Sequence, residues 1–197
     1  MMPDDMPDDM IDKLIDITAV RHSYRTASGP LPVLDGLELS VPEGGFVAVV
    51  WSDVFQGTLM DGFEDKRPSE LSGGMKQRAS LCRALIHQPE VLILDEPFGA
   101  LDAFTREDLW QTMHKVKAEE PFTGVLITHD LRESIFLADR VVVLSSRPAK
   151  TQFVLDIPDT GLRTLDDLYT PEAAERLNIL RHQIEVAQGR TPAGDAA

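Results

Sequence analysis

The chain has 197 residues, of which 43% are apolar and 26% charged, and its net charge at pH 7 is −14. This length suffices for one hydrophobic core, so we expect one main domain. The acidic excess argues against non-specific binding to nucleic acid or to anionic lipid, because both partners are negatively charged. The single cysteine, Cys82, excludes an internal disulfide bond, and its place in an expected helix favours a buried small side chain over a nucleophile.

Acidic residues crowd the first part of the chain, where residues 1–10 combine four aspartates with two prolines. We expect this segment to be a disordered acidic tail, since it has little to bury. It lacks the basic start and the apolar core of a signal peptide. The longest apolar runs, such as residues 141–144, are far too short to cross a bilayer. We expect a second flexible tail over residues 189–197.

The next segments predict strands. Residues 11–20 and 34–41 alternate apolar with polar side chains, which is typical of half-buried strands. Residues 25–32, rich in Ser, Gly and Pro, predict a turn segment between them. Residues 46–50 are continuously apolar and predict a fully buried strand. Residues 51–67 show no period.

Helices and apolar strands alternate through the rest of the chain. We expect buried strands at 91–94, 125–128 and 141–144, and helices at 72–87, 102–120, 131–138 and 171–186. In the expected helices at 102–120 and 171–186, apolar side chains are spaced for one face: Leu109, Met113, Val116, Ala174, Leu177, Leu180 and Ile184. This rhythm predicts right-handed βαβ units and hence an α/β fold with a mostly parallel sheet flanked by helices.

Two acids, Asp95 and Glu96, end the expected strand at 91–94. Ligands of an open parallel sheet bind beyond the carboxyl ends of its strands, so both carboxylates are placed for chemistry. Asp95 would hold Mg²⁺ through water, and Glu96 would polarise a water that attacks a phosphate. The alternative is a solvated acidic turn before Pro97.

A Ser-Gly-Gly turn, Ser72 to Gly74, leads into a helix that begins with Met75-Lys76-Gln77-Arg78. Backbone N–H groups at such a helix start can bind phosphate, and glycines let the backbone approach it closely. The alternative is an ordinary helix cap by Ser72. Arg78 fits a solvated helix face better than a site.

Taken with Leu71 before the turn, these motifs resemble the signature motif and the Walker B strand of ABC transporter ATPases. The resemblance extends to two later segments. Residues 97–102 form a loop that ends in Leu101-Asp102, and the strand at 125–128 is followed by His129. In the family, the aspartate ends the loop after the acids and the histidine contacts the γ-phosphate. The resemblance therefore implies ATP and Mg²⁺ as cofactors, with Glu96 and His129 as catalytic residues, Asp95 on the metal and Asp102 at the nucleotide.

The resemblance implies further roles for residues outside these motifs. The signature residues Ser72, Gly73, Gly74 and Gln77 would act in trans, on ATP held by the second protomer of a head-to-tail dimer. Tyr24 stands where the family places a ring that stacks on adenine, with a packing role as the alternative. Gln56 resembles the glutamine that senses magnesium, with mere junction sequence as the alternative.

The phosphate-binding loop of the family is missing from the sequence. The strand at 46–50 runs into Trp51-Ser52-Asp53, and no G-x-x-x-x-G-K-[ST] occurs anywhere in the chain. We interpret this as an internal deletion of the Walker A loop with its junction at about 51–62, which also reduces the helical subdomain. The expected organisation is an incomplete ABC ATPase domain over 11–188, with a truncated P-loop-NTPase-like fold that the resemblance implies, including antiparallel N-terminal strands. A natural deletion, an engineered one and a gene-model error all remain open.

Residues 96–107 and 137–148 look like the nitrate/sulfonate/taurine branch of the importer ATPases. This implies a cytoplasmic subunit on the inner face of the plasma membrane. Its partners would be a membrane permease, a second ATPase protomer and, indirectly, a substrate-binding protein, with no nucleic acid. Without Walker A, the phosphates of ATP lose their principal charge compensation, so we expect impaired ATP hydrolysis. The alternative function is a non-catalytic remnant or partner module that supplies the signature motif in trans.

Overall fold

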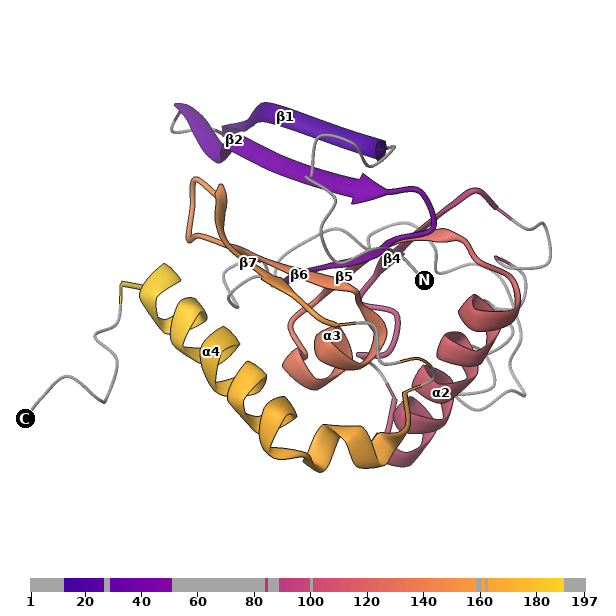
Figure 1. Cartoon of the computed structure of the whole chain (residues 1–197). Coiled ribbons are helices and arrows are strands. Elements are labelled where there is room, and N and C mark those ends of the chain that lie inside the picture. The colour runs from indigo at the N-terminus through magenta and orange to yellow at the C-terminus, as the bar shows by residue number, and fades with distance from the viewer. Residues whose placement is uncertain are drawn as a thin grey trace, which may run out of the picture.

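The computed structural model describes residues 13–26, 29–50, 84, 89–99, 101–158, 161 and 163–189. Within this part of the chain, a two-stranded hairpin lies on one face of a five-stranded sheet and helices cover the other face (Figure 1). The strands are β1 (Lys13–Thr26), β2 (Gly29–Pro42), β3 (Phe46–Val50), β4 (Val91–Asp95), β5 (Thr123–Thr128), β6 (Arg140–Leu144) and β7 (Thr151–Asp156). The helices are α2 (Ala103–Glu119), α3 (Leu131–Leu137), the 3₁₀ helix η3 (Leu165–Tyr169) and α4 (Pro171–Ala187).

The sheet confirms the predicted mostly parallel α/β fold. Its strand order is β4-β5-β3-β6-β7, and every neighbouring pair is parallel except β6 with β7. The carboxyl ends of β3, β4, β5 and β6 therefore lie at one edge of the sheet. The antiparallel strand β7 was not predicted; only six residues long, it has no buried residue.

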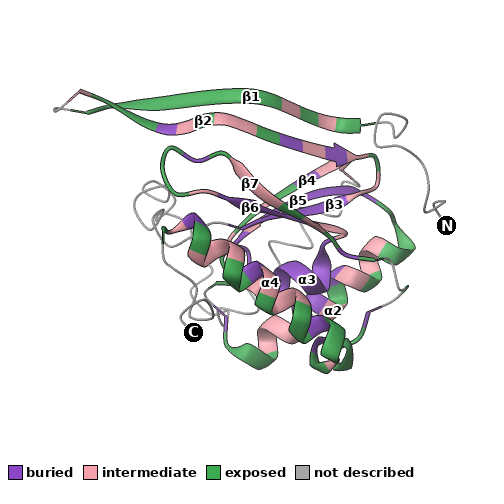
Figure 2. Ribbon diagram, turned by 60° about the vertical axis from the view of Figure 1, so that its left-hand side comes forward, coloured by how far each residue is buried: buried purple, intermediate pink, exposed green. Residues whose placement is uncertain are grey.

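The predicted antiparallel N-terminal strands are confirmed, but they are longer than expected. β1 and β2 pair from Lys13 with Pro42 to Thr26 with Gly29, so most of the predicted turn at 25–32 belongs to strands. Two prolines, a glycine and a serine in that segment led to the turn prediction, but a two-stranded hairpin has free edges where prolines are tolerated. None of the residues of β1 is buried (Figure 2).

The alternation of side chains along β3 explains the layers. All five residues of β3 are buried, as predicted. Phe46, Ala48 and Val50 belong to the core cluster under the helices, while Val47 and Val49 belong to a second cluster that faces the hairpin. A strand that is covered on both faces has no polar side, which is why its sequence is continuously apolar.

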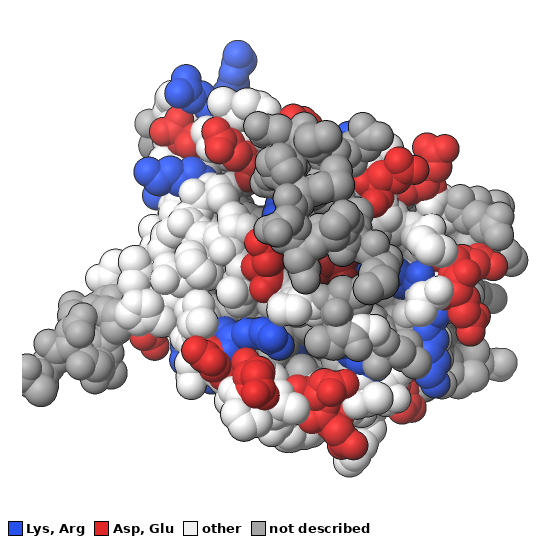
Figure 3. All heavy atoms as spheres, in the orientation of Figure 1, with Lys and Arg blue, Asp and Glu red and all other residues white. Residues whose placement is uncertain are grey.

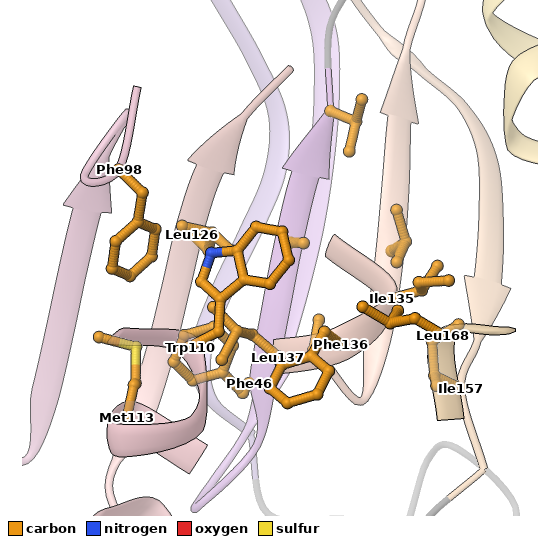
Figure 4. Close-up of a cluster of buried hydrophobic side chains, with 14 of the residues drawn as sticks. Phe46, Phe98, Trp110, Met113, Leu126, Ile135, Phe136, Leu137, Ile157 and Leu168 are labelled. Carbon is orange, nitrogen blue, oxygen red and sulfur yellow. The ribbon is translucent and has the colours of Figure 1, made fainter. Parts of the chain in front are cut away.

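The helices pack against the first of these clusters through a few large side chains (Figure 4). On α2 these are Leu109, Trp110 and Met113; the predicted face is correct, since Val116 is partly buried against the same cluster, and Trp110 is a buried residue that was not predicted. On α4 the buried residues include Ala173 and Leu180; the predicted Ala174 is exposed. The other predicted residues are correct, since Leu180 is buried and Leu177 and Ile184 are partly buried against the same cluster.

The strand β4 corrects one prediction. We expected a fully buried strand at 91–94, but only Leu92 is buried and the side chain of Ile93 is 65% exposed. β4 lies at the edge of the described sheet, and its hairpin-facing side carries Ile93 and Asp95. Sequence alone gives no strand order, so it could not distinguish an edge strand from a central one.

Other predictions fall on residues outside the described ranges. These are the tail at 1–10, the tail at 189–197 except Gly189, the deletion junction at about 51–62, and the helix at 72–87, of which Ala84 alone is described and is helical. No helix in the described part of the chain has the length and apolarity needed to span a membrane. On the face in Figure 3, acidic and basic side chains of the described residues are interspersed, with basic ones gathered at one end of the hairpin.

Candidate active site

Three of the predicted site residues lie at the carboxyl edge of β4 and β5. Asp95 is the last residue of β4 and pairs with Ile127 of β5. The backbone N–H of Glu96 donates to the carbonyl of Ile127 at 2.9 Å, which extends the parallel ladder by one residue. His129 directly follows Thr128, the last residue of β5. The sequence order therefore places these three residues at one edge through the pairing of two neighbouring strands.

Glu96 and His129 are in direct contact. Nδ1 of His129 lies 2.6 Å from Oε1 of Glu96, and their side chains are 49% and 33% exposed. An ionised carboxylate only accepts hydrogen bonds, so His129 donates from Nδ1, and in the neutral imidazole Nε2 is then an acceptor. The contact fixes the ring and leaves its other nitrogen for a ligand.

The backbone at Glu96 is strained. Its φ is +46°, in the left-handed region that residues with a Cβ seldom adopt. Such conformations cost about 1–3 kcal/mol and persist only where the surroundings hold them. The hydrogen bond to Ile127 and the contact with His129 do so here, and the strained turn aims the carboxylate at the histidine.

Asp95 is exposed on the hairpin-facing side of the edge strand. The described residues contain no group of three or more His, Cys, Asp or Glu side chains arranged for a metal ion. Mg²⁺ does not require such a cage, because it keeps several waters and is bound through one or two carboxylates together with substrate phosphates. A single exposed carboxylate at a strand end fits this mode of binding. The other predicted metal ligand, Gln56, lies outside the described residues.

The side chain of Asp102 has a structural role as a helix cap. It caps α2, with Oδ1 accepting from the backbone N–H of Thr105 at 3.0 Å and Oδ2 from its hydroxyl at 2.7 Å. These hydrogen bonds, the backbone one first, hold the pKa of Asp102 below its usual range. The cap fixes where the loop after β4 ends and α2 begins.

Tyr24 lies on β1 of the hairpin and is 51% exposed. It contacts His22 edge to face, with ring centroids 4.9 Å apart, and takes no part in either core cluster. It pairs across the hairpin with Leu31. A little further along β2, Val33 and Asp35 exchange backbone hydrogen bonds with Ala149, in the turn that follows β6. The hairpin therefore carries Tyr24 toward the same carboxyl edge of the sheet that holds Glu96 and His129.

Sequence reasoning missed Glu133, a buried carboxyl on α3 behind the candidate site. The residue is 3% exposed, and its Oε2 accepts from the hydroxyl of Thr128 at 3.1 Å. Burial, together with the negative charges of Asp130 and Glu96, raises the pKa of Glu133 to about 8. The signal in the sequence is its position three residues after the cap Asp130, which is typical of a capping glutamate rather than of a buried one.

The remaining predicted site residues are not described by the structure. Ser72, Gly73, Gly74 and Gln77 lie outside its ranges. The described site thus consists of Asp95, Glu96 and His129 at one edge, with Asp102 at the end of the adjoining loop and Tyr24 on the hairpin.

The sequence was compared with protein families and with known proteins. Residues 35–99 match the family described as ABC transporter. The aliphatic sulfonates import ATP-binding protein SsuB of Bacillus cereus is 46% identical over 97 residues, which cover 49% of this chain and 39% of SsuB. The nitrate import ATP-binding protein NrtD of Synechococcus elongatus is 55% identical over 96 residues, 48% of this chain and 35% of NrtD.

The fold resembles that of a solved ABC transporter cassette. The dimeric structure of MJ0796, a bacterial ABC transporter cassette, superposes with a TM-score of 0.59 at 19% identity, covering 73% of this chain and 98% of MJ0796. This chain is therefore similar to ABC transporter ATP-binding proteins in sequence over about half its length, and to an ABC transporter cassette in fold. The matches to SsuB and NrtD span 39% and 35% of those relatives' lengths.

Proposed function

We propose that the chain is the ATP-hydrolysing subunit of an ABC-type importer for sulfonate- or nitrate-like solutes, impaired by the absence of Walker A. The observation that carries this proposal is the 2.6 Å contact between Glu96 and His129 beside Asp95 at the carboxyl edge of β4 and β5. A carboxylate and an imidazole held together beyond parallel strands are the groups that water-based phosphoryl transfer uses. Similarity to SsuB and NrtD supports the class of solute.

In this proposal Glu96 orients and deprotonates the attacking water. Its Oε1 is engaged by His129, so the water belongs at Oε2. A Cβ built on Gly99 would lie 3.3 Å from that oxygen, so the glycine keeps this side of the carboxylate open. Glu96 thereby keeps one oxygen for a fixed histidine and one for a mobile substrate.

His129 binds the γ-phosphate as the imidazolium, which donates from both ring nitrogens: from Nδ1 to Glu96 and from Nε2 to a phosphate oxygen. Asp95 holds Mg²⁺ through water, with Gln56 as a second ligand, and the bound ion supplies charge compensation for the phosphates. Tyr24 stacks on adenine from the hairpin. These assignments use the residues that the sequence motifs single out, and the shared sheet edge supports them.

The second protomer completes the site. Ser72, Gly73, Gly74 and Gln77 close over ATP bound to the partner of a head-to-tail dimer, and Asp102 lies at the nucleotide from the loop after β4. The dimeric structure of the similarly folded MJ0796 supports a dimer; the head-to-tail arrangement itself is implied by the sequence motifs. ATP hydrolysis drives transport through a membrane permease, to which a substrate-binding protein delivers the solute. In this proposal the subunit therefore lies at the cytoplasmic face of the plasma membrane.

The missing phosphate loop sets the limit on activity. Each charge-assisted hydrogen bond that Walker A would donate contributes about 1.5–3 kcal/mol, and several are lost together. An internal deletion with its junction at about 51–62, within a domain of 11–188, accounts for a sequence that matches the family on both sides. The alternative function is a non-catalytic module that offers Ser72 to Gly74 in trans to an intact protomer.

ATP binding and turnover of the purified chain test the proposal. We expect weak but measurable Mg²⁺-dependent ATP binding by calorimetry and slow hydrolysis that Glu96→Gln abolishes. Glu175→Gln, the same change at an exposed site on α4, is the matched control and should leave hydrolysis unchanged. If no binding is detected, autonomous catalysis is wrong, and the chain should instead be tested for stimulation of an intact importer ATPase.

A further inference from the structure

Arg106, in the first turns of α2, connects the two loops that carry Glu96 and His129. Its Nη1 donates to Oδ2 of Asp130 at 3.0 Å, and its Nη2 donates to the carbonyl of Leu101 at 3.0 Å. Asp130 directly follows His129, and Leu101 belongs to the loop that begins at Glu96. One guanidinium therefore holds both segments at once, from the side of the helices.

The loop after β4 transmits the position of Leu101 back to Glu96. The N–H of Leu101 donates to the carbonyl of Phe98 at 3.1 Å, and the N–H of Gly99 donates to the carbonyl of Glu96 at 3.3 Å. Phe98 is 1% exposed and anchors the middle of the loop in the core. A tight, anchored turn of this kind moves as a unit, so holding Leu101 also holds Glu96.

The loop after β5 is fixed on both sides of His129. The N–H of Asp130 donates to the hydroxyl of Thr128 at 3.0 Å, and Oδ1 of Asp130 accepts from the N–H of Arg132 at 2.9 Å as the cap of α3. The other carboxylate oxygen of Asp130 is the one that Arg106 binds. The half-exposed side chain of His129 thus depends on its backbone neighbours for its position.

The ion pair of Arg106 and Asp130 is partly shielded from solvent, which favours one fixed arrangement of the two side chains. Their side chains are 27% and 23% exposed, compared with 41% for Arg132, which pairs with Glu107 at the surface of the same region. A guanidinium can donate to a carboxylate and to a carbonyl in fixed directions at the same time, which the single point charge of lysine does less well.

We propose that Arg106 is a positioning residue that keeps His129 against Glu96 by tying the loop after β4 to the loop after β5. This inference rests on the proposed function for its catalytic consequence, but the positioning itself exists without nucleotide. Arg106 touches neither a phosphate nor the water in this proposal. It acts through Leu101 and Asp130 on the two residues that do.

The ring nitrogens of His129 report this positioning directly. The chain has five histidines, and in protein labelled with ¹⁵N-histidine the signals of His129 are assigned as those that change in a His129→Gln variant. Glu96→Gln, which weakens the contact, provides the reference shift. We expect Arg106→Met to move the His129 ring signals in the same direction as Glu96→Gln, and Arg106→Lys to move them less. Arg132→Met, the same change at the neighbouring exposed arginine, is the control and should leave them in place.

An unchanged His129 signal in a folded Arg106→Met protein would overturn the proposal. If Arg106→Met does not fold by circular dichroism, Asp130→Asn replaces it, since asparagine keeps the cap of α3 and loses the charge that Arg106 binds. The same shift is expected there, and its absence counts equally against positioning.

Hydrolysis separates this proposal from the proposed function. In an active chain, Arg106→Met should lower kcat by about ten- to hundred-fold with little change in KM, as expected for a displaced catalytic pair. If Glu96→Gln leaves hydrolysis unchanged while Arg106→Met still shifts His129, the function is wrong and the positioning stands. If Glu96→Gln abolishes hydrolysis while Arg106→Met changes neither His129 nor kcat, the positioning is wrong.

Discussion

The β1–β2 hairpin and the carboxyl edge of β4 and β5 are both exposed parts of this molecule, but they are held in different ways. β1 has no buried residue: its Ile15 and Ile17 are only partly buried against the cluster to which Leu39 and Val41 of β2 belong, and those two residues are buried on the sheet. The edge is held instead by polar contacts: Glu96 with His129, Arg106 with Asp130, and Thr128 with Glu133.

This difference indicates where each region tolerates change. In the hairpin, the free energy of folding comes from a few apolar side chains, of which the buried ones are all on β2, so much of the surface of β1 is free for a ligand. At the edge, partly buried charged and polar groups depend on one another, and removing one leaves another unsatisfied. A substitution in the exposed part of the hairpin can therefore change ligand binding without changing the free energy of unfolding, whereas a substitution at the carboxyl edge changes both.

The largest expected change in the free energy of unfolding concerns the buried carboxyl of Glu133. Its pKa is about 8 in the folded chain, compared with 4.5 for an ordinary glutamate, because burial disfavours the charge. Between these values the unfolded chain ionises while the folded chain stays protonated. The contribution of Glu133 is thus favourable below about pH 4.5 and is lost as the pH rises toward 8, by about 1.4 kcal/mol per pH unit.

Glu133→Gln should remove this pH dependence. Denaturant unfolding between pH 5 and pH 8 should show that the variant gains stability relative to the parent chain as the pH rises. Glu175→Gln, on the exposed side of α4, should follow the parent chain at every pH. Equal slopes for the parent chain and Glu133→Gln would mean that the carboxyl is not buried in its protonated form.

The next effect lies in the sheet, where Gly124 of β5 leaves room for a ring. A Cβ at this position would lie 2.3 Å from Cδ2 of Phe46, which is itself confined by Phe122 at a centroid distance of 6.1 Å. We expect Gly124→Ala to lower the free energy of unfolding by about 2–3 kcal/mol, because the ring has no free space to move into.

Gly99→Ala is the matched control at the candidate site. There the added Cβ meets the end of the Glu96 side chain at 3.3 Å rather than a packed ring. Denaturant unfolding should show a loss under about 1 kcal/mol for this variant. If Gly99→Ala lowered the free energy of unfolding more than Gly124→Ala, the claim that the sheet interior is more tightly packed than the carboxyl edge would be wrong.

The sequence predicted the site edge better than it predicted the network behind it. Asp95, Glu96 and His129 follow strands whose apolar runs are unmistakable, and parallel pairing brings such strand ends together. Arg106 and Glu133 could not be predicted, because their partners come from other segments and depend on strand order. The predictions of a buried Ile93 and of a shorter hairpin were wrong for the same reason. A local sequence pattern does not show whether a neighbouring strand covers or pairs with a residue.

The assignments within the site differ in what supports them. The contact between Glu96 and His129 was not deducible from either motif alone, yet both residues were selected by their place after strands. The roles of Ser72, Gly73, Gly74, Gln77 and Gln56 remain predictions from the sequence. Among the described site residues, Tyr24 is the one whose substitution should affect folding least, so its role in ligand binding is the easiest to test.

The smallest expected change in stability concerns Tyr24, and it makes the clearest test of the hairpin. Because Tyr24 is 51% exposed, Tyr24→Ala should change the free energy of unfolding by less than about 0.5 kcal/mol. Val41→Ala, at the fully buried seam between hairpin and sheet, should lower it by about 2 kcal/mol. This contrast checks that the hairpin is attached through β2.

Binding of adenosine then tests whether Tyr24 recognises adenine. Adenosine carries no phosphate, so its binding does not depend on the missing phosphate loop, and stacking on an aromatic ring contributes about 1–3 kcal/mol per base. We expect upfield shifts of the adenine protons in the presence of the parent chain and of Val41→Ala, and their loss with Tyr24→Ala. Equal shifts with and without the tyrosine would show that adenine binds elsewhere, and the hairpin would then have neither a core role nor a ligand role at this position.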